Sequence, residues 1–141
     1  MKAKKSKSLI CVRMEENEDF FEKLKEVVKK FKLKSGIIIH ALGQFKDVEL
    51  GFYDRKRRKY LTKKFKGPFE ITNLSGNISF IGKEIISHVH VVLGKKNFET
   101  ISGHLNKATV TSTLELFILT TPLKFVRKLD KESGLKLLHF S

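Results

Sequence analysis

The chain has 141 residues, and its 29 lysines and arginines against 15 aspartates and glutamates give a net charge of +14. This length predicts one domain, and no apolar segment is long enough for a signal peptide or a membrane helix. A single cysteine excludes an intramolecular disulfide and a thiolate-rich zinc site, and the strand-like run around Cys11 favours a buried thiol. We therefore expect a cytoplasmic protein that does not associate with membranes.

The positive charge is the most prominent feature of the composition. It suits a polyanion, above all nucleic acid, because neutralised phosphates release their counterions. One predicted turn is especially basic, and its candidate phosphate contacts are Arg55, Lys56, Arg57, Arg58 and Lys59. The alternative is a lysine-rich surface of the kind common in proteins from hot environments. No motif for base recognition is visible, so DNA binding is expected to be largely non-specific.

The first third of the chain predicts a tail, a strand and a helix. Residues 1–8 are expected to form a solvated basic tail, and an apolar strand follows over 8–14. Apolar residues at three- and four-residue spacing then predict a long amphipathic helix from near Asn17 to just before Gly36. Acidic residues come early in this segment and lysines late, which matches the helix dipole.

From Gly36 onward the pattern changes to strands and turns. Gly76 is expected to mark a β-bulge. The predicted strands cover residues 36–43, 47–54, 60–65, 67–82 (one bent strand or a strand pair), 84–94 and 108–120, followed by two strands around the turn 130–134. With no low-complexity linker, the sequence predicts a single α+β domain over residues 9–141 with a mostly antiparallel sheet.

Three histidines form the main candidate site. His88 and His90 share one face of the strand 84–94, because side chains alternate along a strand. A short turn then brings His104 back beside them as a hairpin. Three neutral imidazoles suit zinc or another divalent transition metal, and they leave a fourth position open for water or a small ligand. Spacing alone also allows three unrelated histidines.

Two residues near this pattern have candidate roles. Gly103 permits a close approach of the backbone beside His104. Glu115 is the one carboxylate in an otherwise apolar strand, so it could orient a ligand histidine or act as an acid or base on bound water. The alternative interpretation of Glu115 is an outward-facing residue of an alternating strand.

Successive blocks of the chain resemble the PPC domain, the plant and prokaryote conserved domain. The blocks occur in the family's order and cover nearly all of the chain after residue 8. They are SGIIIHALGQFKDVELGFYD, KGPFEITNLSGNIS, SHVHVVLG, SGHLNKATVTSTLELFI and LDKESGLKLLHF. The sequence therefore resembles a stand-alone prokaryotic or archaeal member of this family.

The resemblance implies a compact α+β domain that assembles as a homotrimer. It also implies a metal, usually zinc, held by His88, His90 and His104. The family is similar in structure to acetolactate decarboxylase, which has a three-histidine zinc site, but a shared fold does not transfer an activity. Stand-alone members are called DNA-binding by analogy, and the R-G-R-P core of an AT-hook is absent here.

Two residues depart from the family pattern. Ser102 replaces a glycine of the usual G-G-H-L block, and His40 stands where small or polar residues are more common. Neither change removes a ligand. The first expectation is thus a trimeric, DNA-associated regulatory protein with a metal site. The alternative is a zinc-dependent enzyme for a small anionic substrate, with Glu115 as its acid or base, and a purely structural metal is a third possibility.

Overall fold

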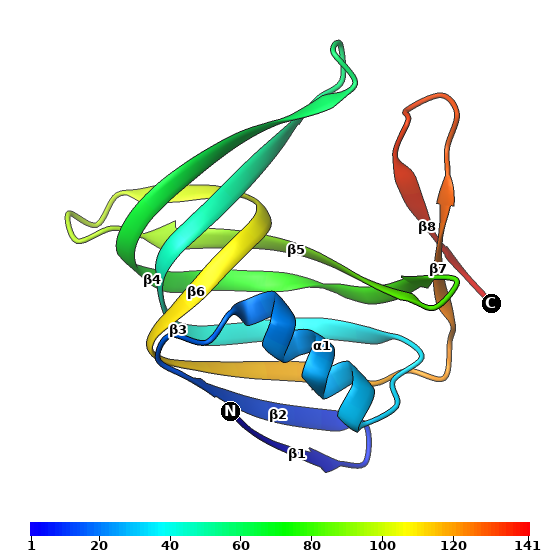
Figure 1. Ribbon diagram of the computed structural model, residues 1–141, viewed down its shortest axis with the longest axis horizontal. Coiled ribbons are helices and arrows are strands. Elements are labelled where there is room, and N and C mark those ends of the chain that lie inside the picture. Colours follow the sequence, from blue (N-terminus) through cyan, green and yellow to red (C-terminus); the bar gives the residue numbers. More distant parts are fainter.

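A long, strongly bent sheet with a single helix against it makes up the structure (Figure 1). The computed structural model describes residues 1–141. The elements are β1 (Lys2–Ser6), β2 (Leu9–Glu15), α1 (Phe20–Lys30), β3 (Gly36–Asp54), β4 (Lys59–Ile81), β5 (Glu84–Gly94), β6 (Thr100–Leu119), β7 (Phe125–Leu129) and β8 (Lys136–Phe140). This mostly antiparallel α+β domain agrees with the fold class that the sequence predicts.

The eight strands follow the order β1-β2-β6-β3-β4-β7-β8, and β5 pairs with both β4 and β6. Every pairing is antiparallel except the short contact between β4 and β7. The strands β3, β4 and β6 are long enough to bend, and β-bulges interrupt their registers. This bending places β5, which carries His88 and His90, between β4 and β6 (Figure 1).

The helix α1 is short, 11 residues, so the prediction of a long helix reaching almost to Gly36 is wrong. Asp19 caps its start by accepting a hydrogen bond from the Glu22 amide. At its end, the Leu33 amide donates to the Val28 carbonyl, and Lys32 adopts the left-handed conformation with φ of 51°. The apolar periodicity would have allowed the helix to continue for one more turn. This C-terminal closure ends it earlier. The helix is neither long nor apolar enough to cross a membrane.

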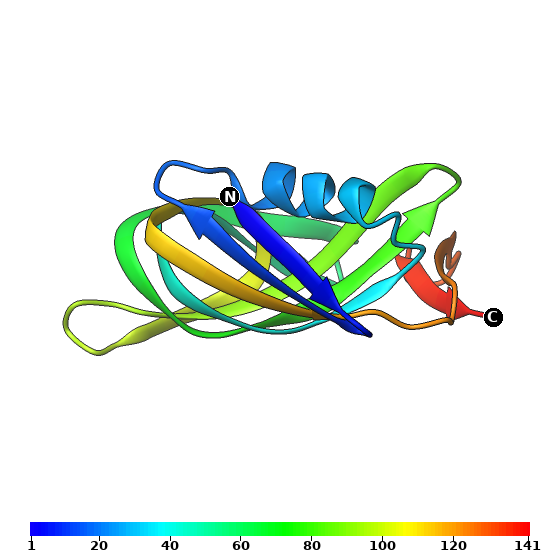
Figure 2. The ribbon, with the colours of Figure 1, turned by 90° about the horizontal axis from the view of Figure 1, so that it is seen from below.

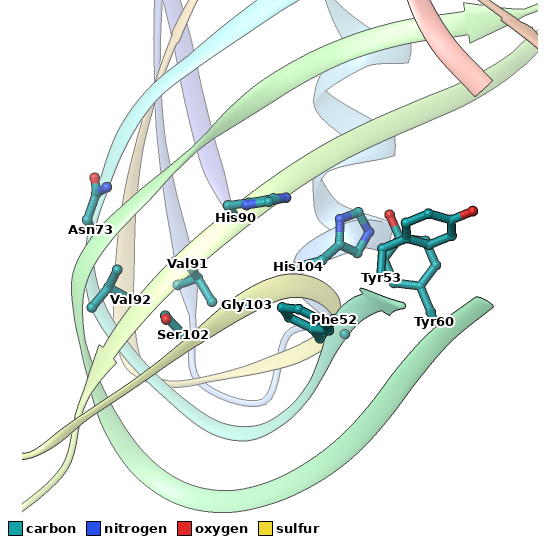
Figure 3. Close-up of a pocket in the computed structure, with 11 residues that line it drawn as sticks. Phe52, Tyr53, Tyr60, Asn73, His90, Val91, Val92, Ser102, Gly103 and His104 are labelled. Carbon is teal, nitrogen blue, oxygen red and sulfur yellow. The ribbon is translucent and has the colours of Figure 1, made fainter. Parts of the chain in front are cut away.

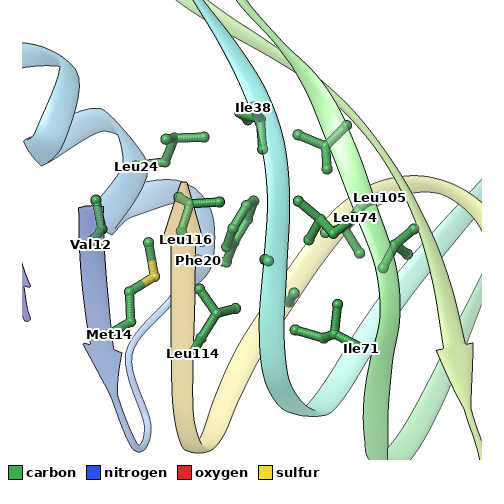
Figure 4. Close-up of a cluster of buried hydrophobic side chains, with 14 of the residues drawn as sticks. Val12, Met14, Phe20, Leu24, Ile38, Ile71, Leu74, Leu105, Leu114 and Leu116 are labelled. Atoms are coloured by element: carbon green, nitrogen blue, oxygen red, sulfur yellow. The ribbon is translucent and has the colours of Figure 1, made fainter. Parts of the chain in front are cut away.

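The core lies between α1 and the inner face of the curved sheet (Figures 2 and 4). The helix buries Phe20, Leu24, Val27 and Val28, whose spacing places them on one side. Phe20 meets Phe45 edge to face, with ring centroids 5.7 Å apart. Burial of such a side chain contributes about 1.5–3 kcal/mol, so this packing orients the helix on the sheet.

The structure corrects four expectations for single segments. Residues 1–8 are basic and mostly exposed, but they do not form a free tail, because Lys2–Ser6 pair with β2 as an edge strand and Met1 and Ala3 pack against the core. Cys11 is exposed and not buried, since Ile10 and Val12 occupy the inward positions of β2. The segments 36–43 and 47–54 form one continuous strand, as do 60–65 and 67–82. The register is regular at Gly76, which is therefore not a bulge.

Candidate metal centre

The β5–β6 hairpin brings the three histidines together, as the sequence predicts. Val89 and Val91 point into the core, so His88 and His90 point to the opposite face of β5. His104 lies directly across from His90 in the antiparallel register. Alternation along one strand and pairing with the next are therefore enough to gather three imidazoles.

The imidazoles form a tight triangle. Their ring centroids are 5.0 Å apart for His88 and His90, 5.0 Å for His88 and His104, and 5.5 Å for His90 and His104. One nitrogen of each ring can be chosen so that all three lie within 4.8 Å of one another. His88 and His104 are half-buried and His90 is exposed. The triangle is thus open to solvent on one side.

Arg127 of β7, which no sequence motif indicates, borders the triangle. Its Nη2 atom donates to His88 Nδ1 at 3.2 Å and to Asn77 Oδ1 at 2.8 Å. Its Nε atom donates to Ser79 Oγ at 3.0 Å and its Nη1 atom to the Lys136 carbonyl at 3.0 Å. Arg127 therefore ties the C-terminal hairpin to the histidine strand. Because it lies far from His88 in the chain, no local motif could reveal it.

The hydrogen bond from Arg127 fixes the tautomer of His88. Arginine has no acceptor, so His88 Nδ1 must accept, and the proton of the neutral ring resides on Nε2. That Nε2 donates to His90 Nε2 at 3.1 Å. A metal bound at His88 Nε2 would require the other tautomer. Asn77, directly opposite His88 on β4, offers an oxygen that could accept the relocated Nδ1 proton.

Three cavities adjoin the histidines, and two of them border more than one histidine. One, of about 520 Å³, is bordered by His90, His104, Ser102, Gly103 and Tyr60 (Figure 3). An added Cβ at Gly103 would lie 3.0 Å from the Gly51 carbonyl oxygen, so glycine permits the close approach of β6 and β3 here.

The second cavity, of about 390 Å³, lies on the side of the C-terminal hairpin. Its lining includes His88, His104, Arg127 and Lys136. It therefore presents two cationic side chains beside two of the three histidines.

The donor set fits a divalent transition metal. The nitrogens of His88 and His90 are 3.1 Å apart, close to the ~3.3 Å that two zinc–nitrogen bonds at a tetrahedral angle require. His104 Nδ1 is buried and has no hydrogen-bond partner. A buried polar atom without a partner is costly, and a metal ion at this place would satisfy it.

Glu115 does not join this cluster. It lies nearer the other end of β6, paired with Arg13 of β2 and Leu42 of β3, and its side chain is exposed on the outer face. It makes no hydrogen bond to any of the three histidines. The interpretation as an outward-facing residue of an alternating strand is therefore the one that the structure favours.

The basic turn between β3 and β4 is exposed but partly compensated by carboxylates. Arg55 lies 3.9 Å from Glu132, and Arg57 lies 3.6 Å from Asp54. Such surface pairs contribute little to stability, but they reduce the charge available to a phosphate.

Acidification should destabilise the metal-free protein between about pH 6.5 and pH 4. Burial lowers the pKa of His88 to about 4, and the charges of His104, Arg127 and His90 act in the same direction. In that window the unfolded chain binds a proton that the folded chain does not, so the free energy of unfolding falls as the pH falls. The full shift amounts to about 3 kcal/mol, and solvent screening at this half-buried site reduces it to roughly 1–2 kcal/mol.

Urea unfolding in the presence of a chelator, at several pH values across this window, measures the effect. The variant His88→Gln should lose much of the pH dependence. An identical pH dependence in the wild type and the variant would contradict the assignment to His88.

Similarity to known proteins supports this description. Residues 1–122 match the model of the Plants and Prokaryotes Conserved (PCC) domain, which is the PPC domain that the sequence blocks resemble. A candidate DNA-binding protein from Bacteroides thetaiotaomicron is 25% identical with a TM-score of 0.92, over 99% of this chain and 96% of that one. A metal-containing protein from Archaeoglobus fulgidus is 28% identical with a TM-score of 0.85, over 98% and 95%. No curated protein matches the chain.

Acetolactate decarboxylase from Bacillus subtilis shares the fold alone. It is 14% identical with a TM-score of 0.56, and the match covers 79% of this chain and 52% of the decarboxylase. The family match spans most of the chain and includes all three histidines, whereas the hairpin of β7 and β8 that carries Arg127 lies beyond it. The chain belongs to the Plants and Prokaryotes Conserved domain family.

Proposed function

We propose that this protein binds a divalent transition metal through His88, His90 and His104, and that the preferred metal is zinc. The observation that carries the proposal is the convergence of three imidazoles around one point, with a buried nitrogen that lacks a partner. The archaeal relative that is described as metal-containing supports it. Bound zinc would act as a Lewis acid toward whatever occupies its fourth position.

We propose further that the metal-binding protein associates with DNA through largely non-specific contacts to phosphates. The net charge of +14 supports this role, and so does the similarity to a candidate DNA-binding protein. No helix is placed for reading the major groove, because α1 is packed on the sheet by its apolar face. The expected contacts are therefore electrostatic.

Binding to duplexes of unrelated sequence should be of similar strength and should weaken steeply with salt. The logarithm of the association constant should fall with the logarithm of salt concentration by about 0.9 for each phosphate neutralised. Fluorescence anisotropy with two labelled duplexes over a salt series measures this. An absence of binding at low salt, or binding that salt does not weaken, would contradict a DNA-associated role.

The proposed assembly is a homotrimer. Its support in the structure is an apolar outer face on β2, β6 and β3, opposite the core. Leu9, Leu119 and Ile37 face one another across these strands and are 39%, 36% and 39% exposed. A patch of this kind is typical of a surface that another molecule covers. Sedimentation equilibrium should give three times the chain mass, and the mass of one chain would contradict the proposal.

A zinc-dependent enzyme for a small anionic substrate is the second candidate. The cavity beside His88 favours it, because Arg127 and Lys136 supply positive charge next to the proposed metal. Glu115, the predicted acid or base, lies on the outer face and cannot serve this cavity within the chain. Calorimetric titration of the zinc-loaded protein with inorganic phosphate tests for the anion site, and no heat of binding would leave the second candidate without support.

A further inference from the structure

A second basic surface lies away from the histidines, at the end of the molecule where three connections meet. The β1–β2 turn, the segment after α1 and the segment after β6 border a groove of about 600 Å³. We call it the lysine groove, after the four lysines that line it, which are Lys5, Lys7, Lys32 and Lys34. It occupies a different part of the fold from the basic turn Arg55–Lys59.

The charge of the lysine groove is uncompensated. All four lysines are exposed, none of them forms an ion pair, and no acidic residue lines the groove. The basic turn differs, because Arg55 and Arg57 each lie near a carboxylate. The groove therefore offers a phosphate chain a site where the positive potential is not reduced by neighbouring acids.

Two of these lysines occupy backbone positions that usually favour glycine. Lys7 in the two-residue β1–β2 turn has φ of 50°, and Lys32 at the end of α1 has φ of 51°. A side chain in this left-handed region costs on the order of 1 kcal/mol relative to glycine. Arg58 of the basic turn adopts the same conformation, with φ of 49°, so this backbone feature is shared by the two basic surfaces.

The walls of the groove are held together by hydrogen bonds between the three connections. The Thr120 amide donates to the Ser8 carbonyl at 2.7 Å, which joins the end of β6 to the β1–β2 turn. Ser35, only 1% exposed, donates to the Leu123 carbonyl and so joins the segment after α1 to the segment after β6. These contacts fix the spacing of the backbone that carries the lysines, which lowers the ordering cost of binding.

We propose that the lysine groove is the surface through which this protein binds duplex DNA, by its phosphodiester backbone. The inference deepens the DNA-associated role and rests on it. It moves the main contact from the basic turn, which the sequence favoured, to four lysines of β1, the β1–β2 turn and the segment after α1. Phe31, which is partly buried, is the one aromatic side chain that lines the groove, and the four lysines dominate it, so the expected contact is with backbone charge and not with base sequence.

The test compares two variants that each lose four positive charges. K5Q/K7Q/K32Q/K34Q removes the groove lysines, and R55Q/K56Q/R57Q/R58Q removes the same charge from the basic turn. Anisotropy with a labelled duplex is measured over a salt series. The groove variant should reduce the salt slope by about 3–4 and weaken binding at least about 100-fold at about 0.1 M salt, whereas the turn variant should retain most of both.

Two further measurements separate the outcomes. K5R/K7R/K32R/K34R keeps the charge and should bind as the wild type does, and circular dichroism melting shows that each variant is folded. Equal losses of DNA affinity in the groove and turn variants, or an unchanged affinity in the groove variant, would overturn the proposal that the lysine groove is the main DNA contact. The DNA-associated role itself would stand. Wild-type protein that does not bind duplex DNA would overturn the DNA-associated role itself.

Discussion

The variant His104→Ala should lose stoichiometric zinc binding. The wild-type protein is expected to hold one zinc ion per chain. Removal of one of its three ligands should weaken zinc binding by more than about 100-fold. Loss of a residue that only orients a ligand by a hydrogen bond typically costs less than this. His104 is the informative position because its Nδ1 atom is buried without a partner. Metal analysis by mass spectrometry after dialysis, followed by competition with a chelator, gives the stoichiometry and the affinity.

His139→Ala is the matched control, since His139 is exposed on β8, outside the three-histidine group. It should retain wild-type zinc content. His88→Ala should behave like His104→Ala. If either cluster variant keeps one zinc ion with wild-type affinity, the metal lies elsewhere and the assignment of this site is wrong.

Gly76→Ala should both destabilise the protein and weaken metal binding. A Cβ at Gly76 would lie 2.1 Å from the carbonyl oxygen of His88 and 3.0 Å from the Cα atom of Val89. Both are backbone atoms of β5, so the strand itself would have to move. We expect a loss of about 2–4 kcal/mol in the free energy of unfolding, and a fall in zinc affinity of more than about tenfold because His88 is displaced.

Gly94→Ala, on the neighbouring strand β5, provides the comparison. An added Cβ there has its nearest neighbour, Thr72 Oγ1, at 3.4 Å, which is an ordinary contact. This variant should change stability by less than about 0.5 kcal/mol and leave the zinc affinity unchanged. Urea unfolding and chelator competition on both variants measure the difference. Similar behaviour of the two variants would contradict a special role for the close approach at Gly76.

The local elements and the histidine hairpin follow from the sequence itself. Alternating residues place His88 and His90 on one face, and the short turn before β6 returns His104 to the same place. The apolar spacing of α1 predicts its buried face correctly. These features depend on neighbours along the chain or across one hairpin, where the periods of strand and helix determine the geometry.

Only the tertiary structure decided how distant segments meet. The end of α1 depends on a hydrogen-bonded closure at Lys32, which apolar periodicity does not reveal. Arg127 reaches His88 because β7 pairs with β4, a contact between segments far apart in the sequence. Glu115 shares a strand with His104, yet the length of β6 separates them.

The distribution of charge was decided in the same way. The sequence determines a net charge of +14 and makes Arg55–Lys59 its most visible basic run. Folding places carboxylates near Arg55 and Arg57 and gathers four unpaired lysines, from β1, the β1–β2 turn and the segment after α1, into one groove. Local periodicity cannot predict such a surface, because it arises from the packing of chain segments that are neighbours only in space.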